Sequence, residues 1–380
     1  MAQLPKLTFF PLGNADCCLI DLQNDKKVLF DYAAKRDTAD RYDKRIDLPR
    51  KLRENLEEAK VDTYEVVAFT HLDDDHTHGA DEFFYLDYAT ACQGEDRIKI
   101  KTLWVPAAVI TESRNDLEPS SQAIQAEARH RLKTGYGIRV FSRPEALKDW
   151  LEKNGLSPES RKQFITDAGQ LAPEFSLAVD GVEVFIHSPF GWRQDDSTVV
   201  DRNRDSLVVQ LTFLVSTQQT RVILGSDVDH QALSDIVTVS KKHHREERLA
   251  WDVIKLPHHC SYLTLGPDRG DEKTTPVKEV DWLFQQQGQR GCNIISTSKP
   301  IPRKGTEDDK CDQPPHRQAA NYLRDLVNDK DGEFVVTMEH PNTNNPQPIE
   351  IEISGLGARL KKPQVVGAAA ITTVSAPRAG

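Results

Sequence analysis

The chain has 380 residues, a formal net charge of −10, 38% hydrophobic residues and 28% charged residues. This length allows one large domain or two ordinary ones, and the acidic balance argues against binding of phosphate backbones through the general surface. The start lacks a basic segment followed by an apolar stretch, and no apolar run approaches ~20 residues, so we expect neither a signal peptide nor a membrane span. Six scattered cysteines without CxxC spacing indicate reduced thiols and a cytoplasmic protein.

The first half of the chain alternates short apolar runs with turn residues. These runs predict strands at 7–12, 17–22 and 27–33, followed by a charged helix within 36–60. A buried strand is expected at Tyr64–Phe69, with a helix starting near Gly79 and a further strand at Lys99–Ile110. Residues 117–170 are mostly helical in character, and we interpret them as an insertion.

The second half repeats this pattern. It predicts strands at 181–189, 206–215, 220–227, 251–259 and 292–298, helices at 229–250 and 315–328, and a final hairpin made of FVVTM and IEIEI. Two strand-rich halves with helices predict an α/β fold, in which two mixed sheets pack face to face with helices outside. We expect one domain over 1–360 and a mobile tail over 361–380.

The segment THLDDDHTHG (70–79) concentrates ionisable side chains directly after a buried strand. His71, Asp73, Asp75 and His76 follow the strand end, and both imidazole and carboxylate are good ligands for divalent first-row metals. A solvated acidic loop is the alternative interpretation. Two histidines that bracket the carboxylates immediately after a strand favour a metal site.

Two later strand ends carry further ligand-type residues. The run TRVILGSD ends in Asp227, a carboxylate that can bridge two cations, and VIKLPHH ends in His258 and His259. A histidine pair alone is more often structural or exposed. Three strand ends with such residues, in order along the chain, favour a shared metal centre.

This ordered set resembles the metallo-β-lactamase superfamily, and within it the nuclease domain of the DNA-uptake channel protein ComEC and its soluble relatives. That branch has Asp where the wider superfamily has the second His of His-x-His-x-Asp-His, as Asp73 does here. Its Asn-x-x-Ser-Leu-Val strand is matched from Asn203 to Val208, and its Leu-Lys-x-Pro-His-His-Gly-Ser by residues 254–261. The resemblance covers about residues 6–355 and implies a metallo-β-lactamase αββα sandwich.

The resemblance also implies roles for individual residues. His71 and Asp73 would hold one ion, and His187 or Asn203 would complete that site. Asp75 and His76 would hold a second ion with His258, although the pattern leaves open whether His258 or His259 is the ligand, and Asp227 would bridge the two ions. His316 corresponds to a histidine near the cleft, or is a solvated residue at a helix start. Asp75, Lys255 and His259 are the catalytic candidates, the last two for holding a phosphate oxygen or protonating the leaving group.

The chain departs from the family pattern at several positions. Cys260 stands where glycine is usual, His78 takes the place of the first glycine of the metal-binding loop, and the turn at Asp227 has an extra residue. The loop after the histidine pair is therefore expected to differ in shape. The insertion is outside the minimal fold and is a candidate surface for specificity or a protein partner.

The function implied is a dinuclear metal-dependent hydrolase, most simply a phosphodiesterase or nuclease, whose nucleophile is a hydroxide bridging the two cations. Asp73 adds an oxygen ligand and shifts the preference from zinc toward manganese without excluding zinc. Two alternatives remain: a hydrolase of small phosphoesters or other esters, and a non-catalytic regulatory protein that acts with protein partners. The acidic surface favours the hydrolase of small esters, and the insertion favours the regulatory protein.

Overall fold

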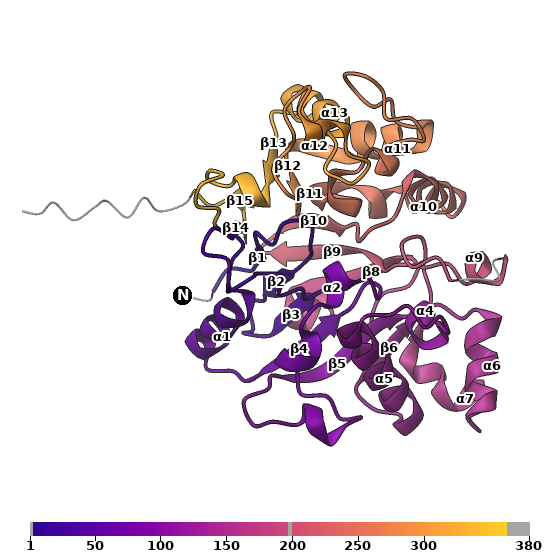
Figure 1. Ribbon diagram of the computed structural model, residues 1–380. Helices are drawn as coiled ribbons and strands as arrows, with labels where there is room; N and C mark the ends of the chain where they lie inside the picture. Colours follow the sequence, from indigo (N-terminus) through magenta and orange to yellow (C-terminus); the bar gives the residue numbers. More distant parts are fainter. Residues whose placement is uncertain (1–2, 197–199, 363–380) are drawn as a thin grey trace, which may run out of the picture.

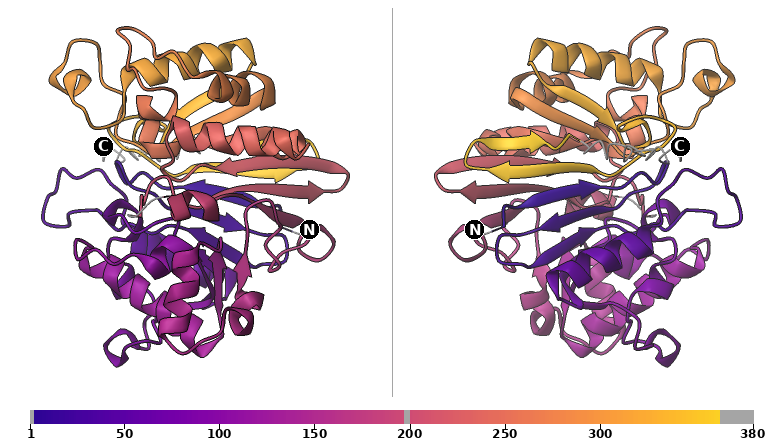
Figure 2. Two further views of the ribbon diagram at one scale, coloured as in Figure 1. Left: turned by 90° about the vertical axis from the view of Figure 1, so that its right-hand side faces the viewer. Right: turned by 90° about the vertical axis from the view of Figure 1, so that its left-hand side faces the viewer.

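Two β-sheets packed face to face form the centre of the molecule, and helices cover both outer faces (Figures 1 and 2). The computed structural model describes residues 3–196 and 200–362. The predicted fold class is thus confirmed. From residue 363 onward, the predicted mobile tail lies outside the described residues.

Within the described residues, the first sheet has nine strands and the second has six. The order in the first sheet is β15 (Gly357–Leu360), β14 (Ile349–Ser354), β1 (Lys6–Phe9), β2 (Cys18–Asp21), β3 (Lys27–Phe30), β4 (Thr63–Ala68), β5 (Lys99–Pro106), β6 (Ile138–Phe141) and β7 (Ile165–Thr166). The order in the second is β13 (Glu333–Val336), β12 (Gly288–Ser296), β11 (Trp251–Lys255), β10 (Gln218–Leu224), β9 (Val208–Val215) and β8 (Val182–Ser188).

The helices form an outer layer on each sheet (Figure 2). Apolar side chains of α1 (Leu48–Ala59), α4 (Ala107–Thr111), α5 (Pro119–Thr134) and α6 (Glu145–Lys153) pack on the first sheet. Those of α10 (His230–Lys242), α11 (Lys278–Trp282) and α13 (Arg317–Asp329) pack on the second. Short helices lie in the connections: α2 (Asp74–Thr77), α3 (Ala80–Phe83), α7 (Pro158–Arg161), α8 (Leu177–Asp180), α9 (Gly191–Asp196) and α12 (Glu307–Lys310). Among the described residues, no helix has the length and apolar character needed to cross a bilayer.

Side-chain alternation along the strands divides the interior into three apolar layers. In β4, Val66 and Ala68 face the layer between the sheets, whereas Val67 faces the helices. In β11, Val253 faces the layer between the sheets and Ile254 faces the helices. Because both faces of these strands are buried, their ends are the places where polar side chains can gather without crossing a core.

The two sheets meet along one edge, where several strands end together. Strands β3, β4 and β5 run parallel in the first sheet, and β10 and β11 run parallel in the second. The carbonyl of Thr70, just after β4, accepts a hydrogen bond of 3.0 Å from the backbone N–H of Leu207, just before β9. Loops from both sheets therefore share this edge.

Several predicted elements were wrong in pairing or extent. FVVTM and IEIEI do not form a hairpin: β13 pairs with β12 in the second sheet, whereas β14 pairs with β1 and β15 in the first. The strand predicted to reach Ile110 ends at Pro106, where alanines begin α4. The insertion is mostly helical, as predicted, and two short strands within it, β6 and β7, extend the first sheet.

Gly225 allows the ends of β10 and β11 to approach closely. A Cβ atom at this position would lie 2.7 Å from Cγ of Pro257 and 2.9 Å from the carbonyl oxygen of Lys255. We therefore expect Gly225→Ala to lower the free energy of unfolding by about 1–3 kcal/mol, as overpacking does. Gly191→Ala is the control, because its nearest contact would be an ordinary 3.4 Å. Denaturant titration of both variants tests this, and equal stability would show that the loops shift freely.

Candidate metal centre

Loops that follow strands of both sheets place a compact group of histidines and aspartates at the shared edge. His71 and Asp73 come directly after β4, Asp75 and His76 lie on α2, Asp227 follows β10, and His259 lies in the turn after β11. One ligand atom from each of Asp75, His76, Asp227 and His259 lies within 4.8 Å of the others. His71 adjoins them, with its ring centroid 4.0 Å from that of His76.

Each of the three histidines is held through its Nδ1 atom. Nδ1 of His76 donates to the Asp31 carboxylate at 2.8 Å, and Nδ1 of His259 donates to the Thr297 carbonyl at 2.7 Å. Nδ1 of His71 lies 3.2 Å from Oγ1 of Thr70. A proton on Nδ1 leaves the Nε2 lone pair available, which is the usual state of a metal-binding histidine.

The carboxylates lie around these Nε2 atoms. Oδ1 of Asp227 is 3.3 Å from Nε2 of His76, and its Oδ2 is 3.5 Å from Nε2 of His259, so the two oxygens face two different imidazoles. Oδ2 of Asp75 is 3.0 Å from Nε2 of His259. Oδ2 of Asp73 is 3.6 Å from Nε2 of His71. Asp227 thus contacts two imidazoles of the same ligand group, which also contains Asp75.

Two further aspartates, which the sequence analysis missed, form a layer behind the ligands. The buried Asp31 carboxylate accepts hydrogen bonds from the backbone N–H and the hydroxyl of Thr70, at 2.7 and 2.8 Å, as well as from His76. Asp16 pairs with the ammonium of Lys255. Asp31 directly follows the apolar strand β3. The pattern that identified Asp227, a ligand-type residue just after an apolar strand, would therefore also have identified Asp31.

The carboxylates of the cluster favour positive charge on the neighbouring groups. Burial lowers the pKa of His76, but the carboxylates of Asp31, Asp227 and Asp75 outweigh burial and raise it well above its usual value. Burial lowers the pKa of His259 too, and Asp227 with Asp75 reverses this. The surrounding carboxylates thus favour positive charge at this position, and a divalent cation can supply it.

The buried atoms without a hydrogen-bond partner fit a metal centre. They include Nε2 of His71, and also Nε2 of His76 and Oδ1 of Asp227, which lie 3.3 Å apart without forming a hydrogen bond. Unpaired buried polar atoms are costly and uncommon, so several in one cluster of nitrogen and oxygen donors indicate a missing ligand. The residues present therefore fit one or two divalent cations.

The structure separates the adjacent histidines of the PHH turn. His259 lies in the ligand cluster; His258 is half-buried, with its ring centroid 6.4 Å from that of His259. Both residues and Cys260 have left-handed backbones, with φ of 50°, 52° and 64°. Cys260 adopts the conformation that glycine takes most easily, at a cost that local packing must offset.

The other predicted site residues lie outside the described ligand cluster. His187 is buried on the helix-facing side of β8, and its Nε2 donates to the Arg248 carbonyl at 2.9 Å. Asn203 has a buried Oδ1 without a hydrogen-bond partner. Lys255 is buried and bonded to Asp16 and to the Ser226 carbonyl. His316 is buried against the ring of Tyr262, with its Nε2 unpartnered.

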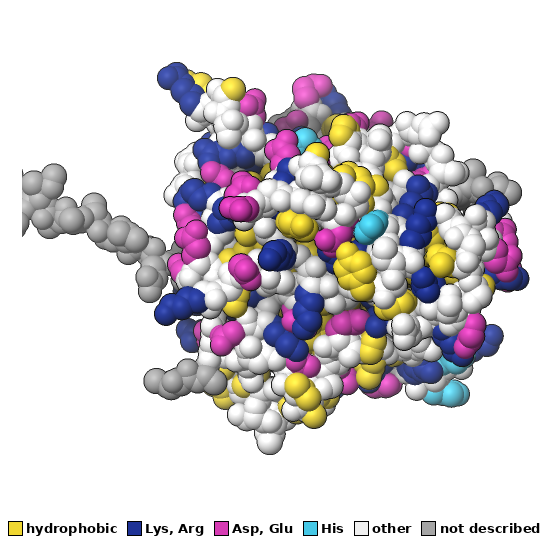
Figure 3. All heavy atoms as spheres, turned by 90° about the horizontal axis from the view of Figure 1, so that it is seen from below, with side chains coloured by type: hydrophobic (Ala, Val, Ile, Leu, Met, Phe, Trp, Pro, Cys, Tyr) yellow, Lys and Arg dark blue, Asp and Glu magenta, His cyan; other side chains and the backbone are white. Residues whose placement is uncertain are grey.

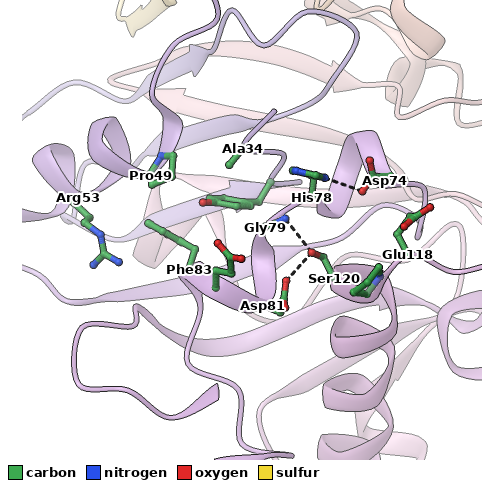
Figure 4. Close-up of a pocket in the computed structure, with 13 residues that line it drawn as sticks. Ala34, Pro49, Arg53, Asp74, His78, Gly79, Asp81, Phe83, Glu118 and Ser120 are labelled. Atoms are coloured by element: carbon green, nitrogen blue, oxygen red, sulfur yellow. Dashed lines mark hydrogen bonds and ion pairs between the residues drawn. The ribbon is translucent and has the colours of Figure 1, made fainter. Parts of the chain in front are cut away.

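A separate cavity of about 580 Å³ lies on the other side of α2 (Figure 4). Asp74 and His78 line it and are bonded to each other at 3.0 Å, whereas Asp75 and His76 of the same helix face the ligand cluster. One helical turn thus separates this cavity from the candidate metal centre.

No protein-family model matches the chain, and no curated protein matches it. Among solved structures, a diphosphatase from the PhnP family matches at 9% identity and a TM-score of 0.33, covering 89% of this chain and 84% of the other. Unliganded yeast PDE1 matches at 10% identity and a TM-score of 0.43, covering 88% of this chain and 97% of the other. A B3 metallo-β-lactamase with an active-site glutamic acid matches at 12% identity and a TM-score of 0.28, covering 87% of this chain and 91% of the other. Because these scores are below 0.5, the chemistry of the site rests on the residues described above.

The adjacent histidines give a matched pair of variants for the metal centre. We expect His259→Gln to lose at least one bound divalent ion per chain, because its Nε2 lies among the ligand atoms. His258→Gln should keep the wild-type metal content. Elemental analysis of the purified proteins measures both. The reverse result would show that the turn is rearranged when metal is bound.

His187 provides a test based on pH. Burial, the largest influence, lowers the pKa of His187 to about 4, so the unfolded chain binds its proton more readily than the folded chain does. The wild type therefore loses stability as pH falls from about 6.5 to 4, by up to about 3 kcal/mol from this residue. His187→Gln should lose less over that range and keep its metal content. Denaturant titrations measure the free energy of unfolding of both proteins at each pH. If it falls equally in wild type and His187→Gln, or if His187→Gln loses metal, this placement of His187 is contradicted.

Proposed function

We propose that this chain is a metal-dependent phosphoester hydrolase, with phosphodiesters as its first candidate substrates, and a ComEC-like member of the metallo-β-lactamase superfamily. One observation carries the proposal: three imidazole Nε2 atoms and three aspartates converge at an edge shared by two sheets, each imidazole held from behind. Such a preorganised set of nitrogen and oxygen donors suits divalent cations.

The distances join Asp75, His76, His259 and Asp227 in one ligand group and bring His71 to Asp73. The family resemblance implies that Asp227 also serves the second group. His71 and Asp73 would hold one cation, Asp75, His76 and His259 the other, and Asp227 would be shared. When bound, such cations lower the pKa of a water molecule and neutralise charge on phosphate oxygens.

The protein's own contribution is to fix these donors. Asp31 and the Thr297 carbonyl hold two imidazoles in one orientation and one tautomer. Lys255 lies behind the cluster, with its ammonium 3.8 Å from Oδ1 of Asp227. It is therefore better placed to stabilise the carboxylates of Asp16 and Asp227 than to reach a substrate.

His258 and His316 are candidates for contacting the substrate beside the cluster. Burial, followed by the positive charge of Arg269, lowers the pKa of His316 to about 4, so its ring is neutral near pH 7. Its Nδ1 accepts the backbone N–H of Tyr262 at 3.3 Å, so its proton is on Nε2. The His316 ring is thus a buried, neutral group near His258, and His258 is the more accessible of the two.

The surface charge bears on substrate size. On the face drawn in Figure 3, lysine and arginine side chains are interspersed with aspartate and glutamate side chains. Duplex nucleic acid is usually bound by clustered basic residues. The net charge of −10 favours small phosphoesters or short single strands over long duplexes, so small-molecule hydrolysis is the second candidate.

The neighbouring histidines of the metal loop provide the decisive test. His76→Gln should reduce turnover of a chromogenic phosphodiester by more than about 100-fold, because loss of a direct ligand exceeds the usual effect of its outer partners. His78→Gln should retain most of the activity, since His78 faces the cavity in Figure 4. The measurement is initial rate of chelator-treated protein titrated with Mn²⁺ or Zn²⁺, and we expect the higher rate with Mn²⁺.

The same assay separates the alternatives. Cleavage of single-stranded DNA or RNA supports a nuclease, and hydrolysis of small phosphoesters or other esters alone supports a small-molecule enzyme. Full metal occupancy without hydrolysis of any of these substrates would refute the hydrolase and favour a regulatory protein. Equal loss of activity in His76→Gln and His78→Gln would show that the ligand assignment within the loop is wrong.

A further inference from the structure

Arg202 lies beside the candidate metal centre, and no sequence pattern singled it out. Its guanidinium is largely buried and contacts three carboxylates, one in the loop after β4 and two in the connection between α4 and α5. Nη1 is 3.3 Å from Oδ1 of Asp73, Nε is 3.2 Å from Oε2 of Glu112, and Nη2 pairs with Asp116. One planar group thus connects a candidate ligand with two acidic side chains outside the ligand cluster.

The contact with Asp73 orients that side chain. Asp73 is the N-cap residue of α2, yet its carboxylate makes no capping hydrogen bond, so the helix does not fix it. Arg202 engages Oδ1, and the other oxygen, Oδ2, lies 3.6 Å from Nε2 of His71. A side chain that is one-third exposed is thereby turned toward the imidazole with which it would share a cation.

Glu112 in turn fixes Arg202. The Glu112 carboxylate is buried and accepts hydrogen bonds from the backbone N–H of Arg114 at 3.0 Å and from its guanidinium at 2.6 and 3.0 Å, besides its contact with Arg202. Its backbone carbonyl accepts from Gln125 at 3.0 Å and from Arg129 at 2.7 Å, both on α5. A rigid series of contacts therefore leads from the insertion to Asp73.

We propose that Arg202 is a positioning residue for Asp73, and that it sets the affinity of the cation site formed with His71. The inference rests on the proposed metal centre and does not require hydrolysis. Partners of this kind typically change metal affinity 10–100-fold when they are replaced. Arginine suits the role better than lysine, because its planar fork can bind Asp73 and Glu112 simultaneously.

The test is isothermal titration of the chelator-treated full chain with Mn²⁺ alone and with Zn²⁺ alone. Arg202→Met should weaken one of the two binding events by about tenfold or more and leave the other within about twofold. Arg202→Lys should fall between wild type and Arg202→Met. Asp116→Asn is the matched control: it removes the exposed partner of the same guanidinium and should leave both affinities unchanged. Circular dichroism of the metal-free proteins checks that each variant is folded.

Each outcome distinguishes this role from the proposed reaction. Wild-type affinity for both ions in Arg202→Met overturns the role of Arg202, whether or not the protein hydrolyses phosphoesters. Equal weakening in Asp116→Asn shows that the charge around the site matters rather than the contact with Asp73, and also overturns it. If Arg202→Met does not fold, Arg202→Lys decides by the same measurements. A wild type that binds neither ion overturns both the metal centre and this inference.

Discussion

The Asp31 carboxylate is the interaction on which the site depends. It is buried at the end of β3 and accepts three hydrogen bonds, two from Thr70 and one from His76. Removing these donors would leave a charge in an apolar interior, which costs several kcal/mol. The loop after β4 therefore has little freedom: it must place Thr70 and His76 around Asp31, and this directs Nε2 of His76 into the cluster.

The other half of the site comes from the second sheet, so it exists only when the sheets are packed together. Asp227 and His259 are far from the first loop in sequence, and they meet it across the edge where Leu207 bonds Thr70. A cation held between them would link the sheets, and its binding free energy would add to folding stability. The apolar layer between the sheets and the polar edge thus stabilise the same packing.

The sequence predicted the layers and the strand ends well because both depend on local patterns. Alternation and turn residues identified most strands, and the order of ligand-type residues after them identified one edge. It could not decide between His258 and His259, because consecutive left-handed residues reverse the usual directions of side chains. It also missed Arg202, whose role arises from contacts with residues about 90 and 130 positions away. The predicted FVVTM–IEIEI hairpin was wrong because β14 pairs with β1, which is far away in the sequence, and local patterns carry no information about such pairing.

The contacts of α5 affect how this protein could be divided or recombined. Besides bonding Glu112, α5 reaches the metal loop itself: Ser121 bonds Thr77 at 2.7 Å, and Ser120 accepts the backbone N–H of Gly79 at 3.0 Å (Figure 4). The insertion is thus not an independent module on a minimal fold. Grafting this segment from a relative, or trimming it to shorten the chain, would disturb the metal loop even though no ligand had been changed.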